Sequence, residues 1–182
     1  MIQAVNLTRN KWRWIDKPMR SGVMQPWLID IGSLTVRLKA RYADFAVHPV
    51  LHINAKAFAD EYALLGLKSN QHALIRDVLL MGHNQPVVFA HSVLPHASLR
   101  GAWRGLGKLG NKPLGAALFA DQKVKRTPLK YKKLSRNHTL YQRATQHLAN
   151  KPSYLWARRS VFSLNCATIL VTEVFLPPLL SK

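Results

Sequence analysis

Two long apolar segments, separated by a short polar turn, are the strongest constraint that the sequence places on the fold. Residues 73–81 (ALIRDVLLM) and 87–94 (VVFAHSVL) are typical of strands, and turn-forming residues occupy positions 82–86. The same pattern recurs near the C-terminus, where residues 156–164 and 168–176 are joined by Asn, Cys and Ala at 165–167. The sequence therefore predicts two β-hairpins.

Helical segments are expected before and between these hairpins. Ser33 is a typical N-cap for a helix over residues 34–42, and an extended segment over 45–53 follows. Further helices are predicted over 97–109, from 116–120 with Pro113 at the first helical position, and over 140–148. Hairpins that flank a helical middle indicate an α+β domain, in which helices pack on an antiparallel sheet.

Composition limits the class of protein. The chain has 182 residues, of which 48 % are apolar, so we expect one domain with its own core and no disordered basic tail. The single cysteine, Cys166, excludes an internal disulfide and Cys-based metal sites. No apolar run reaches about 18 residues, so no transmembrane segment is expected. The basic, Trp-containing N-terminus does not resemble a secretory signal, and we expect a cytoplasmic protein.

A formal net charge of +19 predicts an anionic partner. Fifteen of the 27 Lys and Arg residues lie between Arg100 and Arg159, most densely over residues 123–136. Tyr131, inside this basic stretch, suits stacking on a nucleic-acid base. The alternative is a solvated basic loop or helix face, which we favour because no RNA-binding or zinc-finger signature accompanies it.

The common catalytic and metal-binding motifs are absent. The segment GLGKLGNK (105–112) fails as a phosphate-binding loop because Asn111 stands where the lysine is required. His48 and His52 are expected on a strand, where this spacing separates them too widely for one metal ion. We therefore predict no metal site.

Arg76 and Glu173 are unusual because each interrupts an apolar strand segment. Strand side chains alternate between faces, so each points either to solvent or inward. An inward charge requires a partner or a ligand. Were both inward, they would form a cavity with a cationic and an anionic end, suited to a small molecule with a carboxylate and a hydroxyl. If a helix starts at Pro113, the Leu114 amide is an additional donor for an anion.

Four segments in this order resemble the bacterial chorismate pyruvate-lyases of ubiquinone biosynthesis. The segments are WLIDIGSLT (27–35), LIRDVLL with its hairpin partner (74–94), LGKLGNKPLGAALF (106–119) and LWARRSVF…ILVTEVFLP (155–177). The resemblance implies one α+β domain over residues 1–182, with residues 1–26 as a basic extension or helix. It also implies an antiparallel sheet of about six strands and helical flaps over a buried ligand.

The resemblance also implies a reaction and a site. The family cleaves chorismate to 4-hydroxybenzoate and pyruvate without metal or cofactor. By resemblance, Arg76 holds the ring carboxylate with the Leu114 amide, and Glu173 meets the ring hydroxyl. Leu34 stands where the family has a ligand-contacting methionine, and Lys112 stands where a threonine is expected.

The second carboxylate of chorismate has no assigned partner. Either Arg158 or Arg159 could hold it, or both are surface residues of the hairpin.

The sequence leaves two alternatives to the hypothesis that the protein is a monomeric lyase. Related sensor domains of transcription regulators share the family's fold, so a non-catalytic effector-binding module is one alternative. A nucleic-acid-binding protein is the other, and it would show a steep salt dependence.

Overall fold

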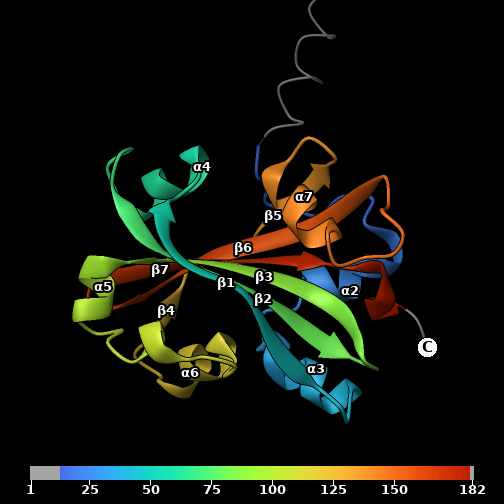
Figure 1. Ribbon diagram of the computed structural model, residues 1–182, viewed down its shortest axis with the longest axis horizontal. Helices are drawn as coiled ribbons and strands as arrows, with labels where there is room; N and C mark the ends of the chain where they lie inside the picture. Colours follow the sequence, from blue (N-terminus) through green and yellow to red (C-terminus); the bar gives the residue numbers. More distant parts are fainter. Residues whose placement is uncertain (1–12, 181–182) are drawn as a thin grey trace, which may run out of the picture.

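A seven-stranded antiparallel sheet forms the centre of the computed structural model, which describes residues 13–180 (Figure 1). Its main order is β1-β2-β3-β7-β6-β4, and β5 pairs with β6. The strands are β1 (Ala46–Lys56), β2 (His72–Gly82), β3 (Gln85–Pro95), β4 (Lys125–Arg126), β5 (Lys130–Ser135), β6 (Tyr154–Leu164) and β7 (Ala167–Phe175). The predicted α+β domain is confirmed, with seven strands among the described residues where about six were expected.

Both predicted hairpins are present, with tighter turns than the sequence indicated. His83 and Asn84 link β2 to β3 with φ of 51° and 56°, and Asn165 and Cys166 link β6 to β7 with φ of 47° and 65°. Two left-handed residues are typical of the two-residue turns whose twist matches that of paired strands. The strands therefore extend further into each turn than the apolar pattern alone predicts.

The helices are short and lie between the strands. They are η2 (Gly22–Met24), α2 (Gln25–Leu28), α3 (Leu34–Arg41), α4 (Ala59–Tyr62), η3 (Ala63–Leu65), α5 (His96–Arg100), η4 (Leu106–Lys108), α6 (Leu114–Ala120), α7 (Thr139–Thr145) and η5 (Pro177–Leu180). The predicted Ser33 cap is confirmed, since its Oγ accepts a hydrogen bond from the Val36 N–H. No helix of the described residues is both long and apolar enough to span a membrane.

Two of the helix predictions need correction. Residues 97–109 do not form one helix, because α5 ends at Arg100 and a turn separates it from η4. Glycines at 101, 105 and 107 weaken helix formation over this segment. Pro113 is the N-cap of α6 and has extended backbone angles, so the first helical residue is Leu114.

Helices cover both faces of the sheet. In Figure 1, α3 and α6 lie together on one face, and α4 and α7 lie on the other. On the α3/α6 face, one apolar cluster includes Trp27, Leu38 and Phe175, and a second includes Trp103 and Phe162. Polar side chains occupy the sheet between these two clusters, which places a candidate site there.

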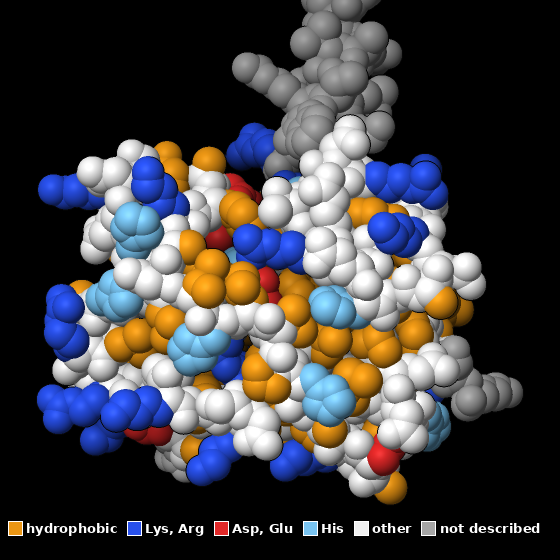
Figure 2. Space-filling model, in the orientation of Figure 1, with side chains coloured by type: hydrophobic (Ala, Val, Ile, Leu, Met, Phe, Trp, Pro, Cys, Tyr) orange, Lys and Arg blue, Asp and Glu red, His pale blue; other side chains and the backbone are white. Residues whose placement is uncertain are grey.

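The basic stretch over residues 123–136 forms β4 and β5 and the loops around them, where a loop or helix face was favoured. Tyr131 is only 6 % exposed and packs in the core, so its ring is not available to stack on a base. On the face seen in Figure 2, Lys and Arg side chains lie mostly at the periphery, and hydrophobic and His side chains occupy the middle. This arrangement does not favour a nucleic-acid surface on that face.

The expected N-terminal extension lies partly outside the described residues, which begin at Arg13. Its described part packs on the domain: Ile15 pairs with Tyr131 in an isolated β-bridge, and the Trp14 indole donates a hydrogen bond to Asp60.

Candidate active site

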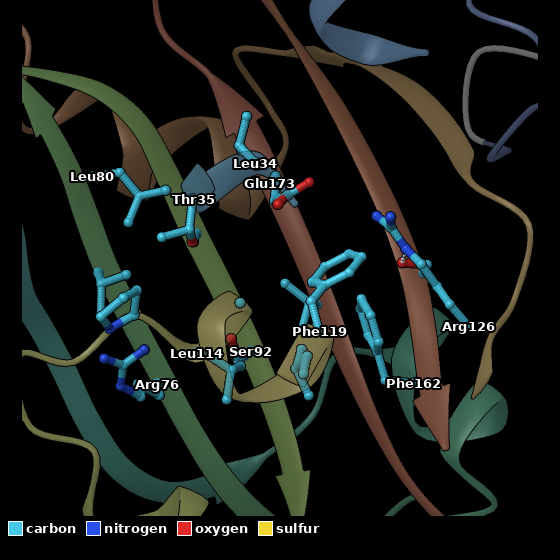
Figure 3. Close-up of a pocket in the computed structure, with 17 residues that line it drawn as sticks. Leu34, Thr35, Arg76, Leu80, Ser92, Leu114, Phe119, Arg126, Phe162 and Glu173 are labelled. Carbon is cyan, nitrogen blue, oxygen red and sulfur yellow. Dashed lines mark hydrogen bonds between the residues drawn. The ribbon is translucent and has the colours of Figure 1, made fainter. Parts of the chain in front are cut away.

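A pocket lies between the sheet and helices α3 and α6 (Figure 3). The space between its lining residues measures about 560 Å³, open solvent at its mouth included. The four residues singled out from the sequence all line it: Leu34 from α3, Arg76 from β2, Leu114 from α6 and Glu173 from β7. The inward orientation of Arg76 and Glu173, left open above, is therefore the one observed.

Arg76 is a buried cation without a buried counter-ion. It is 2 % exposed, and its Nη2 donates hydrogen bonds to the carbonyls of Gly110 and Lys112, at 2.9 and 3.0 Å. Within residues 13–180 no carboxylate pairs with it. Burial lowers the pKa of its guanidinium, which nevertheless stays protonated in proteins. A charge in this position favours an anionic ligand.

Glu173 is held on one side and free on the other. Its Oε2 accepts a hydrogen bond of 2.5 Å from Nε of Arg158. Among the described residues its Oε1 has no partner, and the side chain keeps 15 % of its surface exposed. One carboxylate oxygen is thus available to accept a hydrogen bond from a ligand.

Neither Arg158 nor Arg159 lines the pocket. Arg158 is 1 % exposed, and its Nη1 donates to the backbone carbonyls of Trp27, Leu28 and Asp30. Arg159 points to the other face, where it pairs with Asp60 at 2.9 Å and stacks on Trp14. The structure does not place either residue to meet a second carboxylate in this pocket.

The first turn of α6 faces the pocket through Leu114. Pro113 provides no side-chain cap, and Lys112 does not replace the cap that a threonine would supply. Among the described residues the Leu114 N–H has no hydrogen-bond partner, which is usual in a first helical turn. Gly115 lets α6 approach α3 closely, since a Cβ there would lie 2.8 Å from Oγ1 of Thr35.

Arg126 lines the pocket and was not singled out from the sequence. It is one of seven cations in the basic stretch, and nothing in its immediate neighbours distinguishes it. The distinguishing information is its pairing: β4 aligns Arg126 with Phe162 on β6, whose ring also lines the pocket. That register joins residues 36 positions apart and is not visible in the sequence alone.

A buried ionic cluster lies on the other face of the sheet. His91 contacts Asp77 at 2.6 Å through Nδ1 and Glu61 at 3.1 Å through Nε2, and Arg143 pairs with Asp77 at 3.0 Å. Burial alone would lower the pKa of His91, but hydrogen bonds and charge from the two carboxylates raise it to about 9. Among the described residues no group of three or more His, Cys, Asp and Glu side chains is placed to hold a metal ion.

Comparison with known sequences finds one matching protein family and relatives that share one name. Residues 6–182 match the family described as chorismate lyase. A protein of Thiobacillus denitrificans named probable chorismate pyruvate-lyase is 49 % identical over 158 residues, which cover 87 % of this chain and 84 % of that one. A protein of Nitrosospira multiformis with the same name is 50 % identical over 155 residues, covering 85 % and 86 %.

The fold also occurs in transcription regulators. A GntR-family regulator from Bacillus cereus superposes with a TM-score of 0.57 at 14 % identity, covering 76 % of this chain and 96 % of that one. At this identity the similarity concerns the fold alone.

Proposed function

Because the chain belongs to the chorismate lyase family, we propose that it eliminates pyruvate from chorismate to give 4-hydroxybenzoate. The observation that carries the proposal is the pair formed by Arg76 and Glu173 in one pocket. The two charges belong to β2 and β7, with β3 between them, so their strands lie about 10 Å apart. Side chains converging from that separation suit a ring with a carboxylate at one end and a hydroxyl at the other.

Arg76 and the Leu114 amide bind the ring carboxylate in this proposal. The guanidinium is already fixed by the carbonyls of Gly110 and Lys112, so little conformational freedom is lost when the carboxylate binds. Oε1 of Glu173 accepts a hydrogen bond from the ring hydroxyl. Leu34, Val78 and Leu80 supply apolar contacts along the pocket wall.

The reaction balances without a further reactant. The ether bond between the ring and the enolpyruvyl group breaks, and its electron pair forms the carbonyl of pyruvate. The hydrogen on the hydroxyl-bearing ring carbon passes to the enolpyruvyl methylene through a six-membered arrangement. The electrons of that carbon–hydrogen bond complete the aromatic ring.

The protein then acts mainly by fixing the reactive conformer and stabilising charge on the ether oxygen. Glu173 orients the hydroxyl, and a general-base role is the alternative. We propose that no metal or cofactor takes part, and that the reaction is the first committed step of ubiquinone biosynthesis.

The deciding experiment incubates the purified full-length chain with chorismate and a chelator, and measures 4-hydroxybenzoate and pyruvate by chromatography. We expect equal amounts of the two products. If a folded protein forms neither product in the presence or absence of the chelator, the proposal is wrong.

A non-catalytic effector-binding module is the second candidate, and the fold shared with a GntR-family regulator favours it. It predicts that chorismate binds in the pocket and is recovered unchanged.

A further inference from the structure

Arg126 lies across the pocket from Arg76. The sheet order places Arg76 on β2, Glu173 on β7 and Arg126 on β4, so Glu173 is two strands from each arginine. Figure 3 shows the same arrangement, with the Arg76 and Arg126 side chains on opposite sides and Glu173 between them. The pocket therefore has two cationic ends, and the proposed contacts to the ring use only one of them.

The Arg126 guanidinium is held in place by hydrogen bonds to uncharged groups. Its Nε donates to Oγ of Ser160 and its Nη1 to the carbonyl of Ile31, both at 2.8 Å. The rings of Phe119 and Phe162 lie 5.5 and 5.1 Å from it. Within residues 13–180 no carboxylate forms an ion pair with Arg126, and its Nη2 has no hydrogen-bond partner. A half-buried, oriented guanidinium with a free donor is suited to a carboxylate.

Chorismate carries a second carboxylate, on the enolpyruvyl group. This group is attached to the ring carbon next to the one that bears the hydroxyl. A ring held between Arg76 and Glu173 therefore directs the enolpyruvyl group past Glu173, toward the end of the pocket that Arg126 lines.

We propose that Arg126 forms a second carboxylate subsite, which binds the carboxylate of the enolpyruvyl group that leaves as pyruvate. This inference rests on the function proposed above. Arg126 recognises the part of the substrate that 4-hydroxybenzoate lacks, so it contributes to binding of chorismate and not of this product. Arg76 contributes to both.

The test compares two variants of adjacent residues. Arg126→Met keeps an unbranched side chain against Phe119 and Phe162 and removes the charge. Lys125→Met is the matched control, because it removes the same charge from the neighbouring, exposed position of β4. For each full-length variant, kcat/KM is measured with chorismate, the Kd of 4-hydroxybenzoate by calorimetry, and the fold by circular dichroism.

We expect Arg126→Met to lower kcat/KM for chorismate about 10- to 100-fold, the range of a hydrogen bond to a charged group. The Kd of 4-hydroxybenzoate should change less than about twofold, and Lys125→Met should match the wild type in both. Equal losses for chorismate and 4-hydroxybenzoate, or wild-type kinetics in Arg126→Met, would overturn the subsite.

Two further measurements keep the result interpretable. If Arg126→Met does not fold, Arg126→Gln replaces it, because glutamine also removes the charge, and the same contrast between chorismate and 4-hydroxybenzoate is required. If the wild type forms no 4-hydroxybenzoate, the proposed function is wrong. The subsite is then judged by the Kd of chorismate, which Arg126→Met must raise and Lys125→Met must leave unchanged.

Discussion

Arg158 joins Glu173 to the segment that precedes α3. One guanidinium donates to the Glu173 carboxylate and, through Nη1, to the backbone carbonyls of Trp27, Leu28 and Asp30. The side chain that presents Glu173 to the pocket therefore also fixes residues 27–30, which are far away in the sequence. The position of Glu173 and the folding of residues 27–30 therefore both depend on Arg158.

Arg158→Met should consequently affect stability and activity together. Removing one partner of a buried ion pair typically costs about 3–5 kcal/mol, because the other charge is left unpaired. Urea denaturation measures the free energy of unfolding, and the chorismate assay measures turnover. Unchanged stability in Arg158→Met would contradict the role of this contact, and the exposed Arg104→Met is the control for simple loss of charge.

Glu173→Gln should lower kcat, with a smaller loss of stability than Arg158→Met although it also removes the counter-ion of the buried Arg158. The glutamine carbonyl still accepts a hydrogen bond from Arg158, but it orients the ring hydroxyl less strongly and cannot act as a base. We expect a loss of about 100-fold or more in kcat, measured by the formation of 4-hydroxybenzoate. A variant with wild-type kcat would exclude a role for Glu173 in the reaction.

Arg76→Met should weaken the binding of 4-hydroxybenzoate about 10- to 100-fold, because a charge-assisted hydrogen bond to the ring carboxylate is lost. Calorimetric titration with 4-hydroxybenzoate measures this directly, without turnover. Arg104→Met, which removes an exposed arginine outside the pocket, should bind like the wild type. Tight binding by Arg76→Met would show that the carboxylate lies elsewhere.

Stability should fall as the pH rises from about 6.5 toward 9. The pKa of His91 is raised from 6.5 to about 9 in the folded protein, so the folded state binds a proton more tightly than the unfolded chain. Its stabilising effect is complete below pH 6.5 and is lost as the pH passes 9. The groups around it are Asp77, Glu61 and Arg143.

Thermal unfolding at a series of pH values tests this effect. His91→Gln has no proton to lose in this range and should show a flatter profile between pH 6.5 and 9. If the variant and the wild type have the same slope, His91 is not its source.

Gly115→Ala should separate α6 from α3. The new methyl group would lie 2.8 Å from Oγ1 of Thr35, and overpacking of this kind typically costs about 1–3 kcal/mol. The double variant Thr35→Ala with Gly115→Ala removes the clash and should recover most of the stability. No recovery in the double variant, measured by urea denaturation, would assign the loss to another cause.

The hairpins were predictable because their signals are local. The apolar runs and turn residues lie within about 25 residues of one another, and the structure confirms both pairs. The turn positions were less accurate: residues at 82 and 85 read as turn formers, yet both continue the ladder. The prediction of one helix over residues 97–109 was wrong, because the glycines in this segment outweigh the apolar pattern that favours a helix.

The candidate site was predictable only in part. Arg76 and Glu173 were recognisable as charges within apolar strands, but their common face follows from pairing through β3. Leu34 and Leu114 were singled out with help from the family resemblance, and the structure places both at the pocket. Arg126 was missed because its position at the pocket depends on contacts with Ile31 and Ser160, which are distant in sequence.

The sheet places two different polar environments back to back. Asp77, His91, Thr172 and Arg159 form one row across four strands. On the opposite face, their chain neighbours Arg76, Ser92 and Glu173 line the pocket, and Arg158 lies beside Glu173. A slip of one residue in strand pairing would exchange the two faces. Misregistered chains would then present Asp77 where Arg76 belongs, and this carboxylate would repel the ring carboxylate that we propose to bind there. Correct pairing is thus a condition for ligand binding as well as for folding, and a slipped hairpin is expected to be inert.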